Sequence, residues 1–199
     1  MIYIALLRGI NVGGNNKIEM KKLKQTFEHA GMGHVTTYIN SGNIIFSSQG
    51  QSNEELSLKL EQAILEDFSL PIRVIVRNMK EIQSIIEALP NEWSNDTQMK
   101  SDVMFLWDEI NDISVLDKLP LKTGIGHVIY TTGAVLFSVS KEQVTKSGLT
   151  KLVGTKLYQQ MTMRNVNTTR QIYKLMQMAE QEELRDTDSD CSPKAALEE

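Results

Sequence analysis

The sequence predicts an α+β protein made of two ferredoxin-like (split βαβ) subdomains, the second incomplete, followed by a C-terminal helix. Three observations support this fold class. Short apolar runs rich in β-forming residues alternate with segments whose apolar residues recur every three or four positions. The first of these segments follow the order β-α-β-β-α-β, and the order partly recurs further along the chain. The 199 residues are 41% apolar and 23% charged, which is enough apolar material for a substantial core.

In the first subdomain, residues 1–90, strands are predicted where apolar and β-branched residues run together, and helices where apolar residues share one face. Gly31 ends the first helix, and the turn sequence NSGN joins two strands into a hairpin. The predicted elements are strand Ile2–Leu7, helix Glu19–Ala30, strands His34–Ile39 and Asn43–Ser47, helix Asn53–Phe68, strand Ile72–Val76 and helix Met79–Leu89.

The second subdomain, residues 91–183, begins at the polar segment PNEWSNDTQMK and is predicted as an incomplete copy of the same plan. Thr168 and Gln171 form a capping box that predicts the start of the last helix. Residues 184–199 are expected to be an acidic, disordered tail. The predicted elements are strand Asp102–Trp107, helix Asn111–Leu119, the hairpin His127–Tyr130 with Ala134–Val139, a helical pattern near Lys141, and helix Thr169–Glu183.

Charge and composition argue against several function classes. The net charge of −4 lies entirely in residues 183–199, so the rest of the chain is neutral and shows no basic excess for a nucleic-acid partner. The single cysteine, Cys191, can form no internal disulfide, which indicates a reducing compartment. No signal peptide or run of membrane length is present. We therefore expect a cytoplasmic protein without membrane contact.

Three polar clusters form the predicted binding site. In a split βαβ fold the first two strands run in the same direction, so the loop after the first strand and the turn after the second lie at one end of the sheet. The third cluster stands at the start of the last helix, where free N–H groups attract anions. The clusters are Arg8, Gly9, Asn11, Gly13 and Gly14; Tyr38, Ser41, Gly42 and Asn43; and Arg164, Asn165, Asn167 and Thr168.

The glycines of the first loop allow two interpretations. They can permit positive φ in an awkward connection, or they can let main-chain N–H groups point at an anion. Known phosphate fingerprints do not fit, because Asn15 and Asn16 stand where a P-loop requires Lys and Ser or Thr. Arg8 and Arg164 would clamp an anion with their guanidinium forks, while the asparagines would orient the ligand.

The same segments resemble a known family. ALLRGINVGGNN, TYINSGNIIF and TMRNVNTTRQIYKL are similar to the uncharacterised bacterial family called domain of unknown function 1697, in which they typically read LLRGINVGG, TYLQSGNVVF and TARNWNTV. The resemblance covers Met1 to about Ala179 and implies a cytoplasmic bacterial protein of two ferredoxin-like subdomains, with no established activity. Val166 stands where the family usually has Trp, an indole that would either stack on a ligand or pack in the core.

The residue inventory favours recognition over catalysis. The three histidines are scattered without metal-ligand spacing, and Ser41 has no base in its own motif, so we predict no metal site and no cofactor. The leading hypothesis is binding of a small anionic or nucleotide-like ligand in a pocket formed by the Arg8–Gly14 loop, the Asn40–Asn43 turn and the Arg164–Thr168 helix start.

Other functions stay open. An enzyme could hold a phosphorylated metabolite and Mg²⁺ with the same loops. A single-stranded RNA-binding module could use Tyr3 and Phe46 on the open face of the first sheet, although the neutral charge disfavours nucleic acid. A protein–protein adaptor role through the second subdomain is a further possibility. The sequence decides neither whether the protein is an enzyme nor its oligomeric state.

Overall fold

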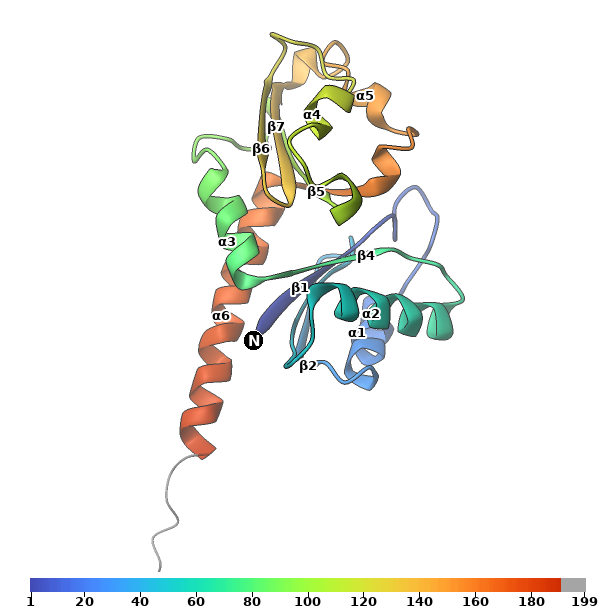
Figure 1. Ribbon diagram of the computed structural model, residues 1–199, viewed down its shortest axis with the longest axis vertical. Coiled ribbons are helices and arrows are strands. Elements are labelled where there is room, and N and C mark those ends of the chain that lie inside the picture. The colour runs from blue at the N-terminus through green and yellow to red at the C-terminus, as the bar shows by residue number, and fades with distance from the viewer. Residues whose placement is uncertain (191–199) are drawn as a thin grey trace, which may run out of the picture.

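The computed structural model describes residues 1–190 and contains two four-stranded antiparallel sheets with a long C-terminal helix beside both (Figure 1). The fold class is therefore α+β, as predicted. The elements are β1 (Ile2–Leu7), α1 (Met20–His29), β2 (Gly33–Tyr38), β3 (Asn43–Ser47), α2 (Asn53–Phe68), β4 (Val74–Asn78), α3 (Met79–Ala88), β5 (Met99–Leu106), η1 (Asp108–Ile110), α4 (Val115–Lys118), β6 (His127–Thr131), β7 (Ala134–Ser140), η2 (Lys141–Gln143), α5 (Leu149–Leu152), η3 (Tyr158–Gln160), β8 (Met161–Asn165) and α6 (Val166–Asp190).

The two sheets share one topology. Their strand orders are β2-β3-β1-β4 and β6-β7-β5-β8, so each sheet places its first strand in the middle, between its third and fourth strands. All neighbouring strands are antiparallel. This is the arrangement of a split βαβ fold. It brings the end of β1 next to the start of β3, with Leu6 opposite Asn43.

The second sheet is complete in strands but has little helix. Its fourth strand, β8, lies in a segment where the sequence predicted no strand, and it pairs with β5 from Asp102↔Asn165 to Leu106↔Met161. The helices that cover this sheet, α4 and α5, are four residues each, where α1 has 10 and α2 has 16. The second copy is thus incomplete in its helices and complete in its sheet.

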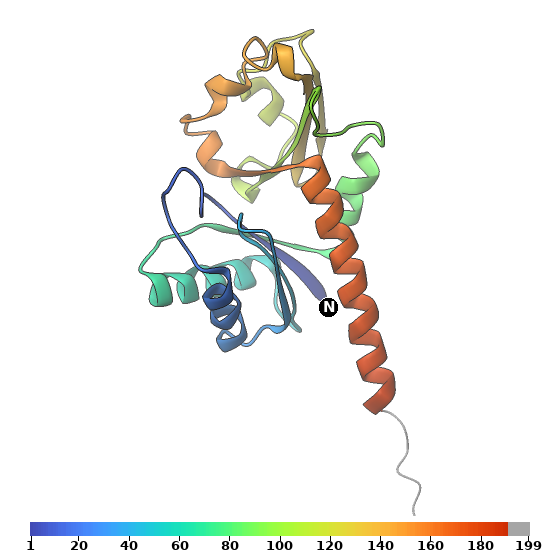
Figure 2. The ribbon, with the colours of Figure 1, turned by 180° about the vertical axis from the view of Figure 1, so that it is seen from behind.

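Helices α3 and α6 pack against both sheets and join them into one molecule (Figure 1). A hydrophobic cluster contains Ile4 of β1, Ile82 of α3, Phe105 of β5 and Met176 of α6, all at most 1% exposed. We call this cluster the shared core. The views from the front and from behind both show α6 running along the two sheets (Figure 2). The outer faces of the sheets are covered by α1 and α2 and by α4 and α5.

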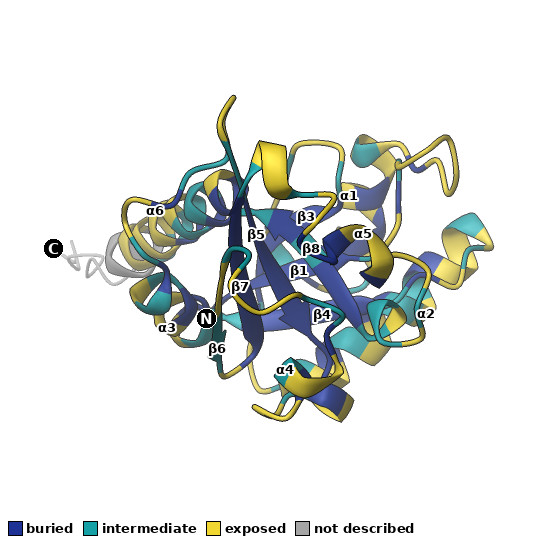
Figure 3. Cartoon of the chain, turned by 90° about the horizontal axis from the view of Figure 1, so that it is seen from above, coloured by how far each residue is buried: buried dark blue, intermediate teal, exposed yellow. Residues whose placement is uncertain are grey.

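Because both faces of the first sheet are covered, β1 is apolar throughout. All six of its residues are buried. Ile2, Ile4 and Leu6 belong to the shared core, while Tyr3, Ala5 and Leu7 pack beneath α1 and α2. The central strands are accordingly dark in the burial colouring, and exposed positions gather on loops and outer helix faces (Figure 3).

This burial removes the surface that single-stranded RNA would need. Tyr3 is 5% exposed and Phe46 is 0% exposed, and both pack under the helices α1 and α2. The opposite face of the sheet is filled by the shared core. Base stacking requires an aromatic ring open to solvent. Neither ring offers one.

The last helix differs from its prediction at both ends. It begins at Val166, because the side chain of Asn165 accepts a hydrogen bond from the N–H of Thr168 at 2.8 Å and so caps the helix. The capping box predicted for Thr168 and Gln171 is wrong, since Thr168 already lies inside the helix. The helix continues to Asp190, so the expected disordered tail does not begin at residue 184. Residues 191–199, including Cys191, lie outside the described residues.

Within residues 1–190, no helix has the length and apolar character that a bilayer crossing requires.

Candidate functional site

Arg164 connects the second sheet to the loops of the first. It lies on β8 and is 7% exposed. Its Nη2 donates to the carbonyls of Leu7 at 2.9 Å, Ser41 at 2.9 Å and Gly42 at 3.1 Å. Its Nε donates to Oδ1 of Asn43. Its Nη1 donates to the hydroxyl of Thr162 at 3.0 Å and the carbonyl of Met163 at 2.8 Å.

These bonds use all five N–H groups of the guanidinium. No carboxylate neutralises Arg164 within the described residues, and burial lowers the pKa of its guanidinium to about 10. In this structure Arg164 is therefore a cross-link between two sheets, and its donors are not available to a ligand.

The Asn40–Asn43 turn is shaped to receive Arg164. Asn43 is fully buried, and its Nδ2 donates to the carbonyl of Tyr38 and to the hydroxyl of Ser41, both at 3.0 Å. Gly42 has a φ of +73°, and a Cβ there would lie 2.7 Å from the Cβ of Leu7. Only glycine fits this position without strain. The turn thus holds its carbonyls toward Arg164 by its own internal bonds.

The loop after β1 folds on itself. Asn11 Nδ2 donates to the carbonyls of Ile18 at 3.0 Å and Asn40 at 2.9 Å, and Asn11 Oδ1 accepts from the N–H of Ile18 at 2.9 Å. Gly13 and Gly14 have φ values of +60° and +83°, and a Cβ at either would meet no atom within 4 Å. These two glycines supply the positive φ of a tight turn. No neighbouring atom lies close enough to require glycine at either position.

Arg8 is the arginine of this loop, and it keeps donors free. Its Nε donates to the carbonyl of Met161 at 3.2 Å and its Nη2 to the carbonyl of Tyr158 at 3.3 Å. Its Cζ lies 5.3 Å from the centre of the Tyr158 ring. Nη1 donates to no described residue, and the side chain is half-buried. Arg8 is therefore positioned by the second sheet and still has N–H groups to offer.

Arg8 and Arg164 line one cleft of about 520 Å³ between the β1 loop and the η3–β8 segment. We call it the Arg8 cleft. Arg73 lines it from the segment just before β4, Tyr158 from η3 and Thr162 from β8. Gly9 and Ser41 are further lining residues that the sequence predicted. No Asp, Glu, His, Lys or Cys is present among the described lining residues, so the charged groups of the cleft are arginines alone.

The other predicted site residues lie elsewhere. Asn11 and Gly14 line a shallow depression on another side of the β1 loop, and Asn165 lines a cavity next to the Arg8 cleft. Asn167 is exposed and donates to the carbonyl of Asn95 at 2.9 Å, which ties the segment after α3 to α6. The remaining predicted residues, Gly13, Tyr38, Gly42, Asn43 and Thr168, do not line the Arg8 cleft.

Val166 packs in the protein interior. Its side chain is 0% exposed and belongs to the shared core. The position is therefore a packing position here, and no ligand platform is lost through the smaller side chain.

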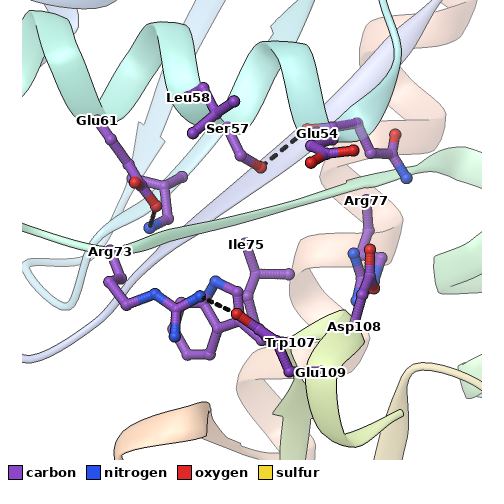
Figure 4. Close-up of a pocket in the computed structure, with 12 residues that line it drawn as sticks. Glu54, Ser57, Leu58, Glu61, Arg73, Ile75, Arg77, Trp107, Asp108 and Glu109 are labelled. Carbon is purple, nitrogen blue, oxygen red and sulfur yellow. Dashed lines mark hydrogen bonds and ion pairs between the residues drawn. The ribbon is translucent and has the colours of Figure 1, made fainter.

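The sequence did not predict a second cleft, which lies between the sheets. It has a volume of about 320 Å³ and lies between α2, β4 and η1 (Figure 4). Arg73 stacks over Trp107, with Cζ 4.4 Å from the ring centre, and pairs with Glu109 at 2.8 Å. Arg77 is 6% exposed and donates to the carbonyl of Leu106 at 2.7 Å. Charged residues within and beside the apolar strand sequence IRVIVRN were the signal that could have revealed it.

Both arginines of this second cleft are already paired with carboxylates. Arg73 faces Glu109, and Arg77 lies 3.3 Å from Asp108. Glu61 accepts a hydrogen bond from the N–H of Val74 at 2.8 Å, and burial raises the pKa of its carboxyl. The cleft therefore works as a set of cross-links between the two sheets. Of the two clefts, the Arg8 cleft is the one with unmatched positive charge.

Comparisons with known proteins agree with this architecture. Residues 1–137 match the family model described as "Protein of unknown function (DUF1697)". Among solved structures, the chain is similar to one described as a conserved bacterial protein from Streptococcus pneumoniae, with 30% sequence identity and a TM-score of 0.74. That alignment covers 88% of this chain and 98% of the other. No curated protein matches the chain.

Proposed function

The chain belongs to the DUF1697 family of proteins of unknown function, and we propose that it binds a small anionic ligand in the Arg8 cleft. The observation that carries the proposal is the composition of the cleft. Three arginines line it without a carboxylate among the described lining residues, and Arg8 has an unbonded Nη1. A phosphate or carboxylate would accept charge-assisted hydrogen bonds there.

The supporting geometry assigns different tasks to the arginines. Arg8 is held by two carbonyls and by the Tyr158 ring, so its guanidinium is oriented before a ligand arrives. Arg164 stays occupied by the loops and contributes positive potential from a buried position. Arg73 adds a third charge at the edge, where Glu109 partly neutralises it. Arg8 is therefore the direct anion contact.

The lining residues favour binding over catalysis. Proton transfer requires a group that titrates near neutral pH, and the titratable lining residues other than arginine reduce to Tyr158. The hydroxyl of Ser41 accepts a hydrogen bond from Asn43 Nδ2 at 3.0 Å, and no base lies among the residues that line the cleft with it. These side chains can hold an anion, and the described residues that line the cleft lack the paired nucleophile and base that covalent catalysis would need.

The proposal is tested by calorimetric titration with inorganic phosphate, pyrophosphate, adenosine monophosphate and citrate. We expect at least one of these anions to bind the native protein. Arg8→Gln keeps a polar side chain for the Met161 carbonyl but removes the charge, and should weaken binding roughly tenfold or more. Arg185→Gln, which removes one exposed charge on α6, is the matched control and should bind as the native protein does.

Circular dichroism and melting temperature should show that both variants are folded. The proposal fails if none of the four anions binds, or if Arg8→Gln and Arg185→Gln bind an anion equally well.

A further inference from the structure

A second cavity adjoins the Arg8 cleft and contains an unusual carboxylate. The cavity has a volume of about 400 Å³, and four residues line both spaces, among them Tyr158 and Arg164. Its own polar residues include Asp102, Lys100 and Asn165. We call it the Asp102 cavity. Because Tyr158 also contacts Arg8, one aromatic ring connects the two spaces.

Asp102 is a buried carboxylate whose partner among the described residues is the ammonium of Lys100. It is 4% exposed, and no described group donates a hydrogen bond of good geometry to its Oδ2. Its contact is ionic, with Lys100 Nζ 2.9 Å from Oδ2. Buried carboxylates in folded proteins are normally paired and also hydrogen-bonded, because removal from water is costly. Oδ2 of Asp102 therefore has an ionic partner but no hydrogen bond of good geometry from a described residue, and a carboxylate of this kind could accept hydrogen bonds from further N–H or O–H donors.

The fold itself does not require an acid at this position. Asp102 lies on β5 on the same face as Met104 and Leu106, which pack beneath α4 and α5. An apolar residue at position 102 would extend the apolar face formed by Met104 and Leu106. Asp102 also stands opposite Asn165 in the ladder, yet Asn165 Oδ1 is used to cap α6 and its Nδ2 donates to no described residue. A polar pair is thus placed at the cavity wall, and the protein uses only part of its hydrogen-bonding capacity.

We propose that the Asp102 cavity receives an amino group of the same ligand whose anionic group is held by Arg8. This inference rests on the proposed anion binding and narrows the ligand to an amino-bearing anion, a zwitterion or an amino-substituted phosphate. The ammonium or amine N–H groups donate to the Asp102 carboxylate, and Lys100 balances the charge when the cavity is empty of ligand. Arg8 and Asp102 then bind opposite ends of one ligand, and Tyr158 lines the space on both sides.

The experiment compares aminoalkyl phosphates of increasing chain length with alkyl phosphates of the same length, by calorimetric titration. At the chain length that spans the two spaces, we expect the amino compound to bind the native protein roughly tenfold tighter than its alkyl counterpart. Asp102→Asn should abolish this advantage without weakening the alkyl phosphate. Arg8→Gln should weaken both compounds.

Two further measurements keep the test decisive. Lys100→Met removes the competing ammonium, so it should increase the preference for the amino compound. Asp102→Asn should melt at the same temperature as the native protein or higher, since it removes a charge that is incompletely solvated by the fold. A large fall in melting temperature would show that the carboxylate serves the fold and would overturn the inference.

The outcomes separate the two proposals. If alkyl and amino compounds bind the native protein equally, or if Asp102→Asn retains the preference, the amino subsite is wrong while anion binding at Arg8 stands. If no phosphate binds at any chain length, the amino subsite is wrong, and the anion site is wrong as well if citrate also fails to bind.

Discussion

At the scale of single residues, Arg164 shows how a guanidinium can serve as a structural cross-link. It joins β8 to the end of β1 and to the Asn40–Asn43 turn through hydrogen bonds to three carbonyls and one side-chain amide. Those acceptors are buried or half-buried, and they lose their donor once the side chain is shortened. The energetic importance of Arg164 therefore lies in the partners it would leave behind.

Arg164→Ala should lower the free energy of unfolding by on the order of 3 kcal/mol, because several buried carbonyls lose their donor at once. Arg164→Lys should restore little of this loss, since a single ammonium cannot reproduce the planar fork. Urea unfolding followed by circular dichroism measures both. Arg185→Ala, at an exposed position, should change stability by less than about 0.5 kcal/mol. Equal stabilities for Arg164→Ala and Arg185→Ala would show that the cross-link is dispensable.

Glu61 has the opposite effect on stability, because its ionised carboxylate destabilises the fold. Burial raises the pKa of its carboxyl above the ordinary 4.5, an effect partly offset by the hydrogen bond from Val74 N–H and by Arg73. A carboxyl with a raised folded pKa holds its proton where the unfolded chain has released it. Stability from this group is therefore lost as the pH rises from about 4.5 through the folded pKa.

Glu61→Gln should raise the melting temperature at pH 7, because the amide keeps an oxygen acceptor for Val74 N–H and carries no charge. The difference from the native protein should shrink as the pH falls below 4.5, where the native carboxyl is neutral in both states. Thermal unfolding at several pH values measures this. Glu92→Gln, at an exposed position, should leave the melting temperature at pH 7 unchanged. A difference that grows on acidification would contradict the assignment.

At the scale of elements, the residue at which helix α6 begins is decided by the strand that precedes it. The sequence predicts a cap at Thr168, in a capping box with Gln171, whereas in the structure Asn165 caps the helix three residues earlier. The strand β8 decides between them. Because β8 pairs with β5 through Asn165, the chain leaves the sheet there and the helix must begin at Val166. A tertiary constraint thus overrides a local sequence signal.

Asn165→Ala should lower the free energy of unfolding by about 1 kcal/mol, the usual effect of removing a side-chain cap. Gln171→Ala should change it by less than about 0.5 kcal/mol, since Gln171 is an interior helix residue and not part of a capping box. The two variants are compared by urea unfolding under identical conditions. A larger loss at Gln171 than at Asn165 would restore the capping box at Thr168.

The elements also show what the sequence could and could not predict. Strand β3 and helix α2 have the predicted ends, because their apolar periodicity and flanking turn residues are clear. Strand β8 was missed, since MTMRN has no β-branched apolar residue, its alternation of Met with Thr and Arg spans only four residues, and it includes a buried arginine. It is a strand because β5 needs a partner. Pairing of this kind depends on tertiary contacts that no local pattern encodes.

The candidate site was predictable to a similar degree. Topology alone predicted that the loop after β1 and the Asn40–Asn43 turn lie at one end of the sheet, and in the structure Asn11 of the loop donates to the carbonyl of Asn40 in the turn. The sequence could not say which donors would be free. Arg8 and Arg164 have equal chemistry, and their difference arises from contacts across the sheets. Asp102 was assigned to a strand, but its incomplete solvation is visible only in three dimensions.

At the scale of the whole molecule, the shared core makes the two sheets interdependent. Helix α3 and helix α6 each contact strands of both sheets, and their buried residues belong to one cluster with β1 and β5. The Arg8 cleft and the Arg73–Glu109 cross-link also lie between the sheets. A chain of 199 residues with two similar sheets could unfold in two steps. The common core predicts that it unfolds in one.

Met176→Ala tests this cooperativity. Met176 is 0% exposed in the part of α6 that faces both sheets, so its truncation should lower the free energy of unfolding by roughly 2–5 kcal/mol. Tryptophan fluorescence reports Trp93 and Trp107, which lie in the shared core, while far-ultraviolet circular dichroism reports both sheets. If the sheets form one cooperative unit, the two signals change at the same urea concentration, and the variant shifts both midpoints together.

Met178→Ala provides the matched control on the same helix, because Met178 is 55% exposed and its truncation should leave both midpoints in place. A fluorescence midpoint that moves while the circular dichroism signal divides into two transitions would mean that one sheet persists without the other. The cleft between the sheets would then open before the protein unfolds, and a ligand bound to Arg8 would be released in that first step.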